Sequence, residues 1–168
     1  YVPGNLFFVI VGAVDPGEVR DQVASFFQDL PQKPLPAIHV PQEPNQLGRR
    51  DVFKEFSTPV TKFLMAWRIP GVTHEDMPAL DVLATVLGGG RSSRLHAQVR
   101  ERDGLVHRIN ACSFTPSDSG LFAVAADLNP DNREEVESVI SEQVDQLAVN
   151  GVSEDEVSKA GRMALASQ

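Results

Sequence analysis

The sequence predicts an α+β fold, a two-layer sandwich in which a mainly antiparallel sheet carries helices on one face. Segments with strand-like alternation come in neighbouring pairs, and segments with helical apolar spacing come in neighbouring pairs after them. Such runs of strands beside runs of helices are typical of a sheet packed against a separate helix layer. The expected helices carry acidic or mixed charge, so they would form the solvated layer.

The first thirty residues predict one strand and one helix. Residues 6–11 are continuously apolar and rich in β-branched side chains, which is typical of a buried strand. Asp15 is a suitable N-cap, with Pro16 at the first helical position and Glu18 two residues later. The apolar residues of the helix then follow at helical spacing until Pro31 ends it: Val19, Val23, Phe26, Phe27 and Leu30.

Proline density predicts a linker between two domains. Five of the twelve prolines lie between positions 31 and 44, and such density favours extended chain with little helix. We therefore expect a strand–helix tail at residues 1–30, an interdomain linker at residues 31–48, and a second domain at residues 49–168. Because the chain stops inside a helical pattern, we expect this second domain to be truncated at its C-terminus.

The second domain is expected to open with a β-hairpin and a helix. Residues 52–56 and 63–69 alternate in polarity on either side of a short turn. Thr73 and Asp76 resemble a capping box at a helix start, and Gly88 is a natural residue to follow the helix end. The apolar stripe of this helix consists of Leu80, Leu83, Ala84 and Leu87.

A short helix and two strands are expected next. Ser92 or Ser93 would cap the helix, and Gly104 would close it. Strand patterns then cover residues 106–114 and 121–128, with turn residues between them.

Two helices complete the expected order. The first starts at Asn129 and ends at Gly151, and Ser153 with Glu156 forms a full capping box at the start of the second. Their apolar residues are Val136, Val139, Ile140, Val144 and Leu147 in the first helix, and Val157, Ala160 and Ala164 in the second.

Composition excludes several classes of function. The formal net charge of −8 disfavours nucleic acid as a partner. No apolar run approaches the ~18 residues of a membrane span. The single cysteine, Cys112, excludes an internal disulfide and a thiolate zinc site. Its place in a strand pattern predicts a small buried apolar residue.

The four histidines predict no metal site in this chain. A zinc-binding helix needs two imidazoles four residues apart on one face. His74 and the glutamate after it begin such a pattern, but Pro78 occupies the second position. His39 lies in the expected linker, while His96 and His107 are separated by a helix end.

The glycine-rich segment 88–95 leaves more than one interpretation open. The G-x-S-x-G elbow of a nucleophilic serine is missing, because Arg94 stands where its second glycine belongs. Backbone N–H groups near Arg91 and Arg94 would suit an anion, although the phosphate-binding P-loop and dinucleotide patterns are both absent. A helix end followed by a tight turn is the simpler interpretation.

Several segments in collinear order resemble the pitrilysin/insulinase family of zinc metallopeptidases, which includes mitochondrial processing peptidase. The strongest are Gly88-Gly89-Gly90-Arg91-Ser92-Ser93-Arg94-Leu95 and Arg100-Glu101-Arg102-Asp103-Gly104-Leu105. Residues 1–15 look like the last strand and turn of the family's first domain. Residues 43–50 look like its interdomain linker, and residues 151–157 like a late helix start.

The resemblance implies a layout in which two homologous α+β domains enclose a chamber. In this family the first domain carries an inverted H-x-x-E-H zinc motif, and the second faces it and helps to hold substrate. Residues 1–30 would then be the tail of a zinc-bearing domain, with the zinc itself expected upstream of Tyr1. The compartment stays open, and the periplasm is favoured if the protein is bacterial.

The resemblance also implies substrate-binding residues. Many family members carry an Arg and a Tyr, seven residues apart, that hold the substrate backbone opposite the zinc. Arg100 matches the Arg, whereas His107 stands at the Tyr position, where an imidazole can still donate a hydrogen bond but is shorter than a phenol. Gly88, Gly89 and Gly90 look like a short form of the glycine-rich loop that lines the chamber.

The leading expectation is therefore the non-catalytic part of a zinc endopeptidase, which binds peptide or unfolded protein and is inactive alone. Its structural partner would be the upstream zinc domain or a homologous subunit. The rival is an inactive structural or binding subunit of a peptidase complex, and an anion-binding module is the third. Because residues 6–11 would expose an unpaired apolar edge, we expect the fragment to dimerise.

Overall fold

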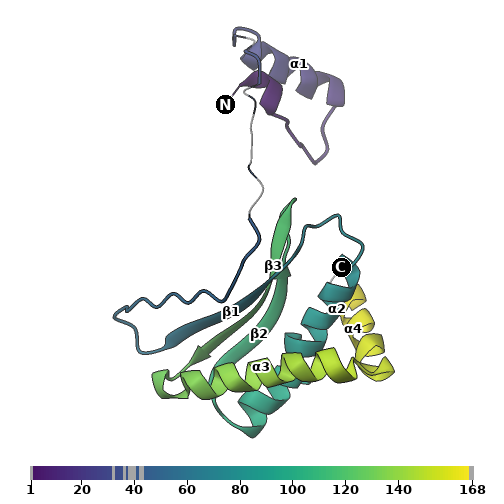
Figure 1. The fold of residues 1–168 in the computed structure, drawn as a ribbon. Helices are drawn as coiled ribbons and strands as arrows, with labels where there is room; N and C mark the ends of the chain where they lie inside the picture. Colours follow the sequence, from purple (N-terminus) through teal and green to yellow (C-terminus); the bar gives the residue numbers. More distant parts are fainter. Residues whose placement is uncertain (1, 32, 36, 38–40, 42–43, 167–168) are drawn as a thin grey trace. The chain divides into compact units, whose positions relative to one another are not determined.

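The computed structural model describes residues 2–31, 33–35, 37, 41 and 44–166. The chain divides into two compact units, Tyr1–Gln42 and Glu43–Gln168 (Figure 1). Described residues between positions 31 and 48 belong to no helix or strand. His39, which the sequence placed in the linker, lies outside the described residues.

The first unit contains the predicted helix but lacks the predicted strand. After a short 3-10 turn, Pro3–Asn5, helix α1 covers Pro16–Phe27. Its cap is the expected one, because the Asp15 carboxylate accepts from the backbone nitrogens of Gly17 at 2.8 Å and Glu18 at 2.9 Å. Residues 6–11 are extended but exposed and unpaired, so the buried strand is a wrong prediction. A strand needs a neighbour for its backbone groups, and no described segment of the chain supplies one.

The second unit is built on a three-stranded antiparallel sheet. Strands β1 (Thr61–Pro70), β2 (Val106–Phe114) and β3 (Ser119–Leu128) lie in the order β1-β3-β2. The hairpin of β2 and β3 was predicted from its turn residues. The other predicted hairpin is wrong, because residues 52–56 form no strand and β1 pairs with β3 instead, Met65 opposite Val124. Three apolar side chains of that segment stay exposed, among them Phe53 at 77%.

The helix layer covers one face of this sheet. Helix α2 spans Met77–Gly88, a π-helix η2 spans His96–Arg102, and helices α3 and α4 span Arg133–Asn150 and Glu154–Ala166. A single 3-10 turn, Pro130–Asn132, leads into α3. Figure 1 shows α2, α3 and α4 on the same side of the strands. The predicted α+β sandwich with helices on one face is therefore confirmed.

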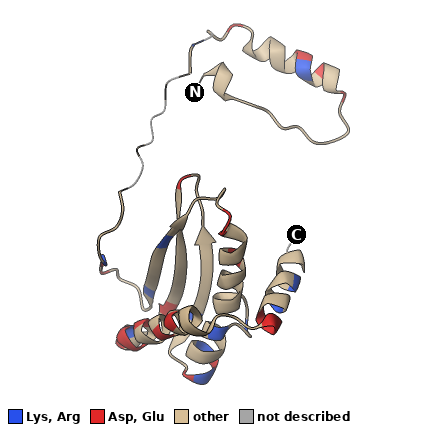
Figure 2. Cartoon of the chain, turned by 45° about the vertical axis from the view of Figure 1, so that its right-hand side comes forward, with Lys and Arg blue, Asp and Glu red and all other residues tan. Residues whose placement is uncertain are grey.

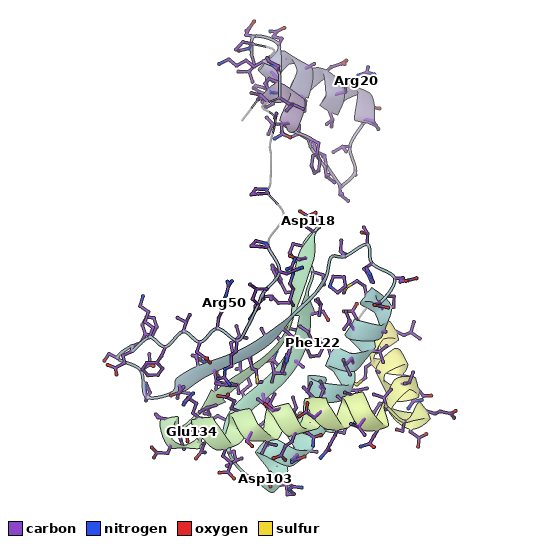
Figure 3. The ribbon with its side chains drawn as sticks, in the orientation of Figure 1. Arg20, Arg50, Asp103, Asp118, Phe122 and Glu134 are labelled. Carbon is purple, nitrogen blue, oxygen red and sulfur yellow. The ribbon has the colours of Figure 1, made fainter. Side chains whose placement is uncertain are left out.

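The core lies between the sheet and the helices because strand side chains alternate. On β1 the odd-numbered residues point inward. Trp67 lies against Phe122 of β3, which is labelled in Figure 3, and the two ring centroids are 6.3 Å apart. Residues from every layer are almost fully buried: Leu87, Leu95, Val99, Val124, Leu128, Val136 and Ile140. The even-numbered residues of β1 are exposed on the opposite, helix-free face. Cys112 lies on this face and is exposed, so the expectation of a buried cysteine is wrong.

Two of the three helix caps predicted in the second unit differ in the structure. Asp76 precedes α2 but its side chain makes no capping bond, so the box with Thr73 does not form. The Ser93 hydroxyl donates to the Gly90 carbonyl oxygen at 2.7 Å, and the helix that follows is largely π-helical. The third cap is confirmed: the Ser153 nitrogen donates to Glu156 at 2.8 Å, and the Glu156 nitrogen donates back to the Ser153 hydroxyl at 3.3 Å.

Candidate functional site

The three glycines end helix α2 where it meets strand β2. A Cβ atom added at Gly88 would overlap the backbone nitrogen of Ala111, so only glycine lets the helix end approach the strand this closely. Gly90 has φ of +86°, a conformation that side chains disfavour. Packing and turn geometry therefore account for Gly88 and Gly90, and their predicted role in lining a chamber stays a prediction.

The segment after the glycines is fastened to helix α4. Lys159 donates to both the carbonyl and the hydroxyl oxygen of Ser92. The Arg94 guanidinium holds the Glu156 carboxylate with two hydrogen bonds of 2.6 and 2.7 Å, and it also donates to the Gly151 carbonyl at 3.2 Å. Arg94 is thus committed to a structural contact with α4, which sequence analysis did not foresee.

This contact strongly lowers the pKa of Glu156. The hydrogen bonds from Arg94 are the main cause that lowers the pKa of Glu156 from 4.5 to about 2, and the bonds from Ser153 act in the same direction. The same carboxylate therefore serves as the partner of an arginine and as the second half of the capping box.

The π-helix places His96 beneath Arg100. The His96 side chain is buried, with the residue only 6% exposed, and its Nε2 lies 2.9 Å from Nη1 of Arg100. A guanidinium can only donate, so Nε2 accepts and the ring proton of neutral His96 resides on Nδ1. That Nδ1 is buried without a hydrogen-bond partner, and the nearest carboxylate oxygen, Oε1 of Glu101, lies 3.6 Å away.

The sequence pattern raised His96 only as a possible metal ligand, and its contact with Arg100 was not predicted. The signal was present, since His and Arg four residues apart lie on one side of a helix. An exposed cation that is held by a buried side chain is more rigid than a cation surrounded only by solvent.

His107 lies at an irregularity of strand β2. The pairing of β2 with β3 shifts register between Val106 and Arg108, so His107 sits in the bulge and is exposed. Its Nε2 lies 3.2 Å from the side-chain oxygen of Asn129, a contact that sequence analysis also missed. Among the described residues, no hydrogen bond or ion pair joins His107 to Arg100, so the structure gives each of them a separate partner.

Comparison with known proteins identifies the family. The family model described as the peptidase M16 inactive domain matches residues 1–163. The chain belongs to this family. The motifs of the sequence resemble those of the pitrilysin/insulinase metallopeptidases, and this resemblance is thereby confirmed.

Relatives of this inactive domain come from several bacteria. A protein of Streptomyces coelicolor named an uncharacterized zinc protease is 32% identical over 95% of this chain and 36% of its own length. A Bacillus subtilis protein named "probable inactive metalloprotease" is 26% identical over 92% of this chain and 36% of its own. The crystal structure of a Helicobacter pylori protease matches with a TM-score of 0.78 and 25% identity, over 94% of this chain and 39% of that one. This chain thus spans little more than a third of these relatives.

The described residues of this inactive domain contain no cluster of metal-binding side chains. Within them, no group of three or more His, Cys, Asp or Glu side chains is placed to hold a metal ion. His74 lies beside Asp76, whose carboxylate is 3.5 Å from the imidazole, but these two side chains form a pair and not a group of three. The described helices also include none that combines the length and apolarity needed to cross a membrane.

Proposed function

We propose that this chain is the non-catalytic part of a zinc endopeptidase, which binds peptide or unfolded protein opposite a zinc site carried elsewhere in the same protein. Membership in the inactive-domain family supports this, as do the relatives named zinc proteases. In this proposal residues 1–30 are the tail of the zinc-bearing domain, residues 31–48 the linker, and residues 49–168 the substrate-facing domain. Zinc would be held by residues outside this chain.

The observation that carries the proposal is the arrangement of Arg100. Its guanidinium is exposed, yet one nitrogen is held by the buried ring of His96. The remaining N–H groups have no partner among the described residues, so they are available for a peptide carbonyl or carboxylate. His107 supplies a second hydrogen-bonding group, and Gly88, Gly89 and Gly90 complete the substrate-binding set by resemblance.

The test is the affinity of the chain for a fluorescent unfolded peptide, measured by fluorescence anisotropy. We expect Arg100→Met to weaken binding about tenfold, because charge-assisted hydrogen bonds to the peptide are lost. Arg102→Met is the matched control, since Arg102 lies on the same π-helix but is paired with Asp103 at 2.6 Å. Equal effects of the two substitutions would contradict the role of Arg100.

The second candidate is an inactive partner subunit. His107 at the position of the family's Tyr favours it, and one relative carries the name of an inactive metalloprotease. The full-length protein that contains this chain decides between the two candidates. Stoichiometric zinc together with peptide hydrolysis supports the endopeptidase, whereas peptide binding with neither zinc nor hydrolysis supports the partner subunit.

We also propose that this chain self-associates. The apolar residues 6–11 are exposed and extended, with Phe7 86% accessible, and from Phe7 to Val11 their backbone groups have no backbone partner among the described residues. Pairing with the same segment of a second copy would satisfy these groups.

A further inference from the structure

The helix-free face of the sheet differs in charge from the rest of the protein. The chain carries a net charge of −8, and the acids gather on the helix layer, where α3 alone has five acidic residues against one arginine (Figure 2). The helix-free face carries three cations and one acid, at Lys62, Arg68, Arg108 and Asp127. Asp127 lies opposite both Lys62 and Arg108 in the strand register, so the positive charge is only partly balanced.

A hollow of about 280 Å³ opens at one end of this face. Its lining combines two arginines, Arg50 and Arg68, with the apolar side chains of Phe114 and Leu121, which are 65% and 44% exposed. Phe114 and Leu121 are register partners on adjacent strands, so they form one continuous apolar surface. A site of this composition suits a ligand with both a negative and an apolar group.

The two arginines are held differently. Arg68 donates to the Pro44 carbonyl at 3.0 Å and to the Asn45 side chain at 3.2 Å, which ties the preceding segment to β1. Arg50 has no hydrogen bond or ion pair to any described residue, and Figure 3 shows its side chain projecting away from the ribbon.

The backbone beside Arg50 is nevertheless anchored. Arg49 pairs with Asp51 at 2.6 Å and with Glu137 of α3 at 2.5 Å. The Arg50 guanidinium therefore lines the hollow as a cation without a hydrogen bond or ion pair among the described residues, on a segment fixed by its neighbour.

We propose that this face binds acidic segments of extended polypeptide, with a carboxylate of the segment bound by Arg50 at the hollow and its apolar side chains on Phe114 and Leu121. This inference rests on the proposed function and names the substrate class of the peptide-binding domain. Guanidinium groups bind carboxylates with two parallel hydrogen bonds, which gives the acidic side chain its advantage over an amide. The ten-residue strand β1 spans about 30 Å, so the face accommodates a segment of several residues.

Cys112 provides a probe of binding at this face. It is the single cysteine of the chain, it is exposed, and it lies on the same face as Arg68 and Phe114. The experiment compares two fluorescent peptides that differ only in Asp and Glu against Asn and Gln. For each, it measures the affinity and the rate at which iodoacetamide alkylates Cys112.

We expect the acidic peptide to bind at least about tenfold more tightly than its amide counterpart and to slow the alkylation of Cys112. Arg50→Gln should abolish most of this preference without changing the affinity for the amide peptide. It removes no hydrogen bond or ion pair to a described residue, so the fold should persist, which thermal unfolding checks. Arg162→Gln, an exposed arginine on helix α4, is the matched control and should change neither affinity.

The outcomes separate this inference from the function on which it rests. Equal affinity for the two peptides, or binding without protection of Cys112, overturns the acidic-segment site while leaving peptide binding through Arg100 intact. Failure of both peptides to bind overturns both. Loss of the acidic preference in Arg162→Gln as well as in Arg50→Gln would show a general charge effect and would also overturn the site.

Discussion

Glu156 should make the stability of the chain depend on pH in the acidic range. Its folded-state pKa of about 2 lies below the value of 4.5 that applies to the unfolded chain. The stabilisation by the Arg94 contact is therefore complete above the unfolded pKa and is lost as the pH falls through the folded one.

Replacing Glu156 tests this dependence. We expect Glu156→Gln to lower the free energy of unfolding by about 1–2 kcal/mol at pH 7, because the bidentate pair with Arg94 is lost. Urea unfolding at pH 7 and at pH 3 measures the effect, and the difference from the unmodified chain should shrink at pH 3. Glu154→Gln is the control on the same helix turn, and a pH-independent difference for Glu156→Gln would contradict the assignment.

Substitutions at His96 should show whether this residue stabilises the π-helix or orients Arg100. His96→Phe fills the same buried space and removes the unpartnered Nδ1, so we expect unchanged or slightly higher stability, by up to about 1 kcal/mol. Peptide affinity should nevertheless fall several-fold, because Arg100 loses the acceptor that holds it. His96→Gln restores an acceptor and should recover part of the affinity; a matching loss in both variants would argue against positioning.

The approach of helix α2 to strand β2 depends on Gly88. An alanine there would collide with the backbone of β2, so we expect Gly88→Ala to lower the free energy of unfolding by about 2–4 kcal/mol. Gly161→Ala is the matched comparison, since a Cβ at this helical position of α4 meets no atom within 4 Å. It should raise stability by about 0.5–1 kcal/mol. Thermal unfolding of the two variants should therefore shift in opposite directions.

The sequence predicted those elements whose signals are local. Helix α1 followed from Asp15 and Pro16, the last helix from Ser153 and Glu156, and the β2–β3 hairpin from the turn between its strands. The pairing of β1 with β3 was not predictable in this way, because its paired residues lie far apart in the sequence, from Pro70 with Ser119 to Thr61 with Leu128, and because it depends on the packing of both strands against the helices. Residues 52–56 alternate in polarity as a strand does, but this alternation does not provide a second strand for them to pair with.

The candidate site was predicted in part. Arg100 and His107 came from motif positions, whereas their partners His96 and Asn129 emerge only from the folded geometry. The π-helix was missed because its wider turn leaves no distinct apolar period over seven residues. The exposure of Cys112 was also not predicted. A strand pattern shows that side chains alternate between two faces, but it does not show which face the helices cover.

The self-association of the whole chain can be tested on residues 6–11. We expect the combined substitution Phe7→Lys and Val9→Lys to shift the chain towards monomer, because edge lysines oppose strand pairing. Light scattering across a range of concentrations measures the change. Leu47→Lys, at an exposed apolar residue outside the segment, is the control. A monomeric unmodified chain whose 6–11 amides are protected from hydrogen exchange would contradict the proposal.

The contact between Arg94 and Glu156 has a consequence for the order in which the protein matures during synthesis. The two residues are 62 positions apart, and Glu156 lies in the last described helix. When the glycine turn of a nascent chain has left the ribosome, helix α4 has not yet been synthesised. The turn therefore stays without its anchor until α4 follows. In ribosome-stalled chains that end before Glu154, trypsin should cleave the bond after Arg94. In chains that extend past α4, this bond should be protected from cleavage.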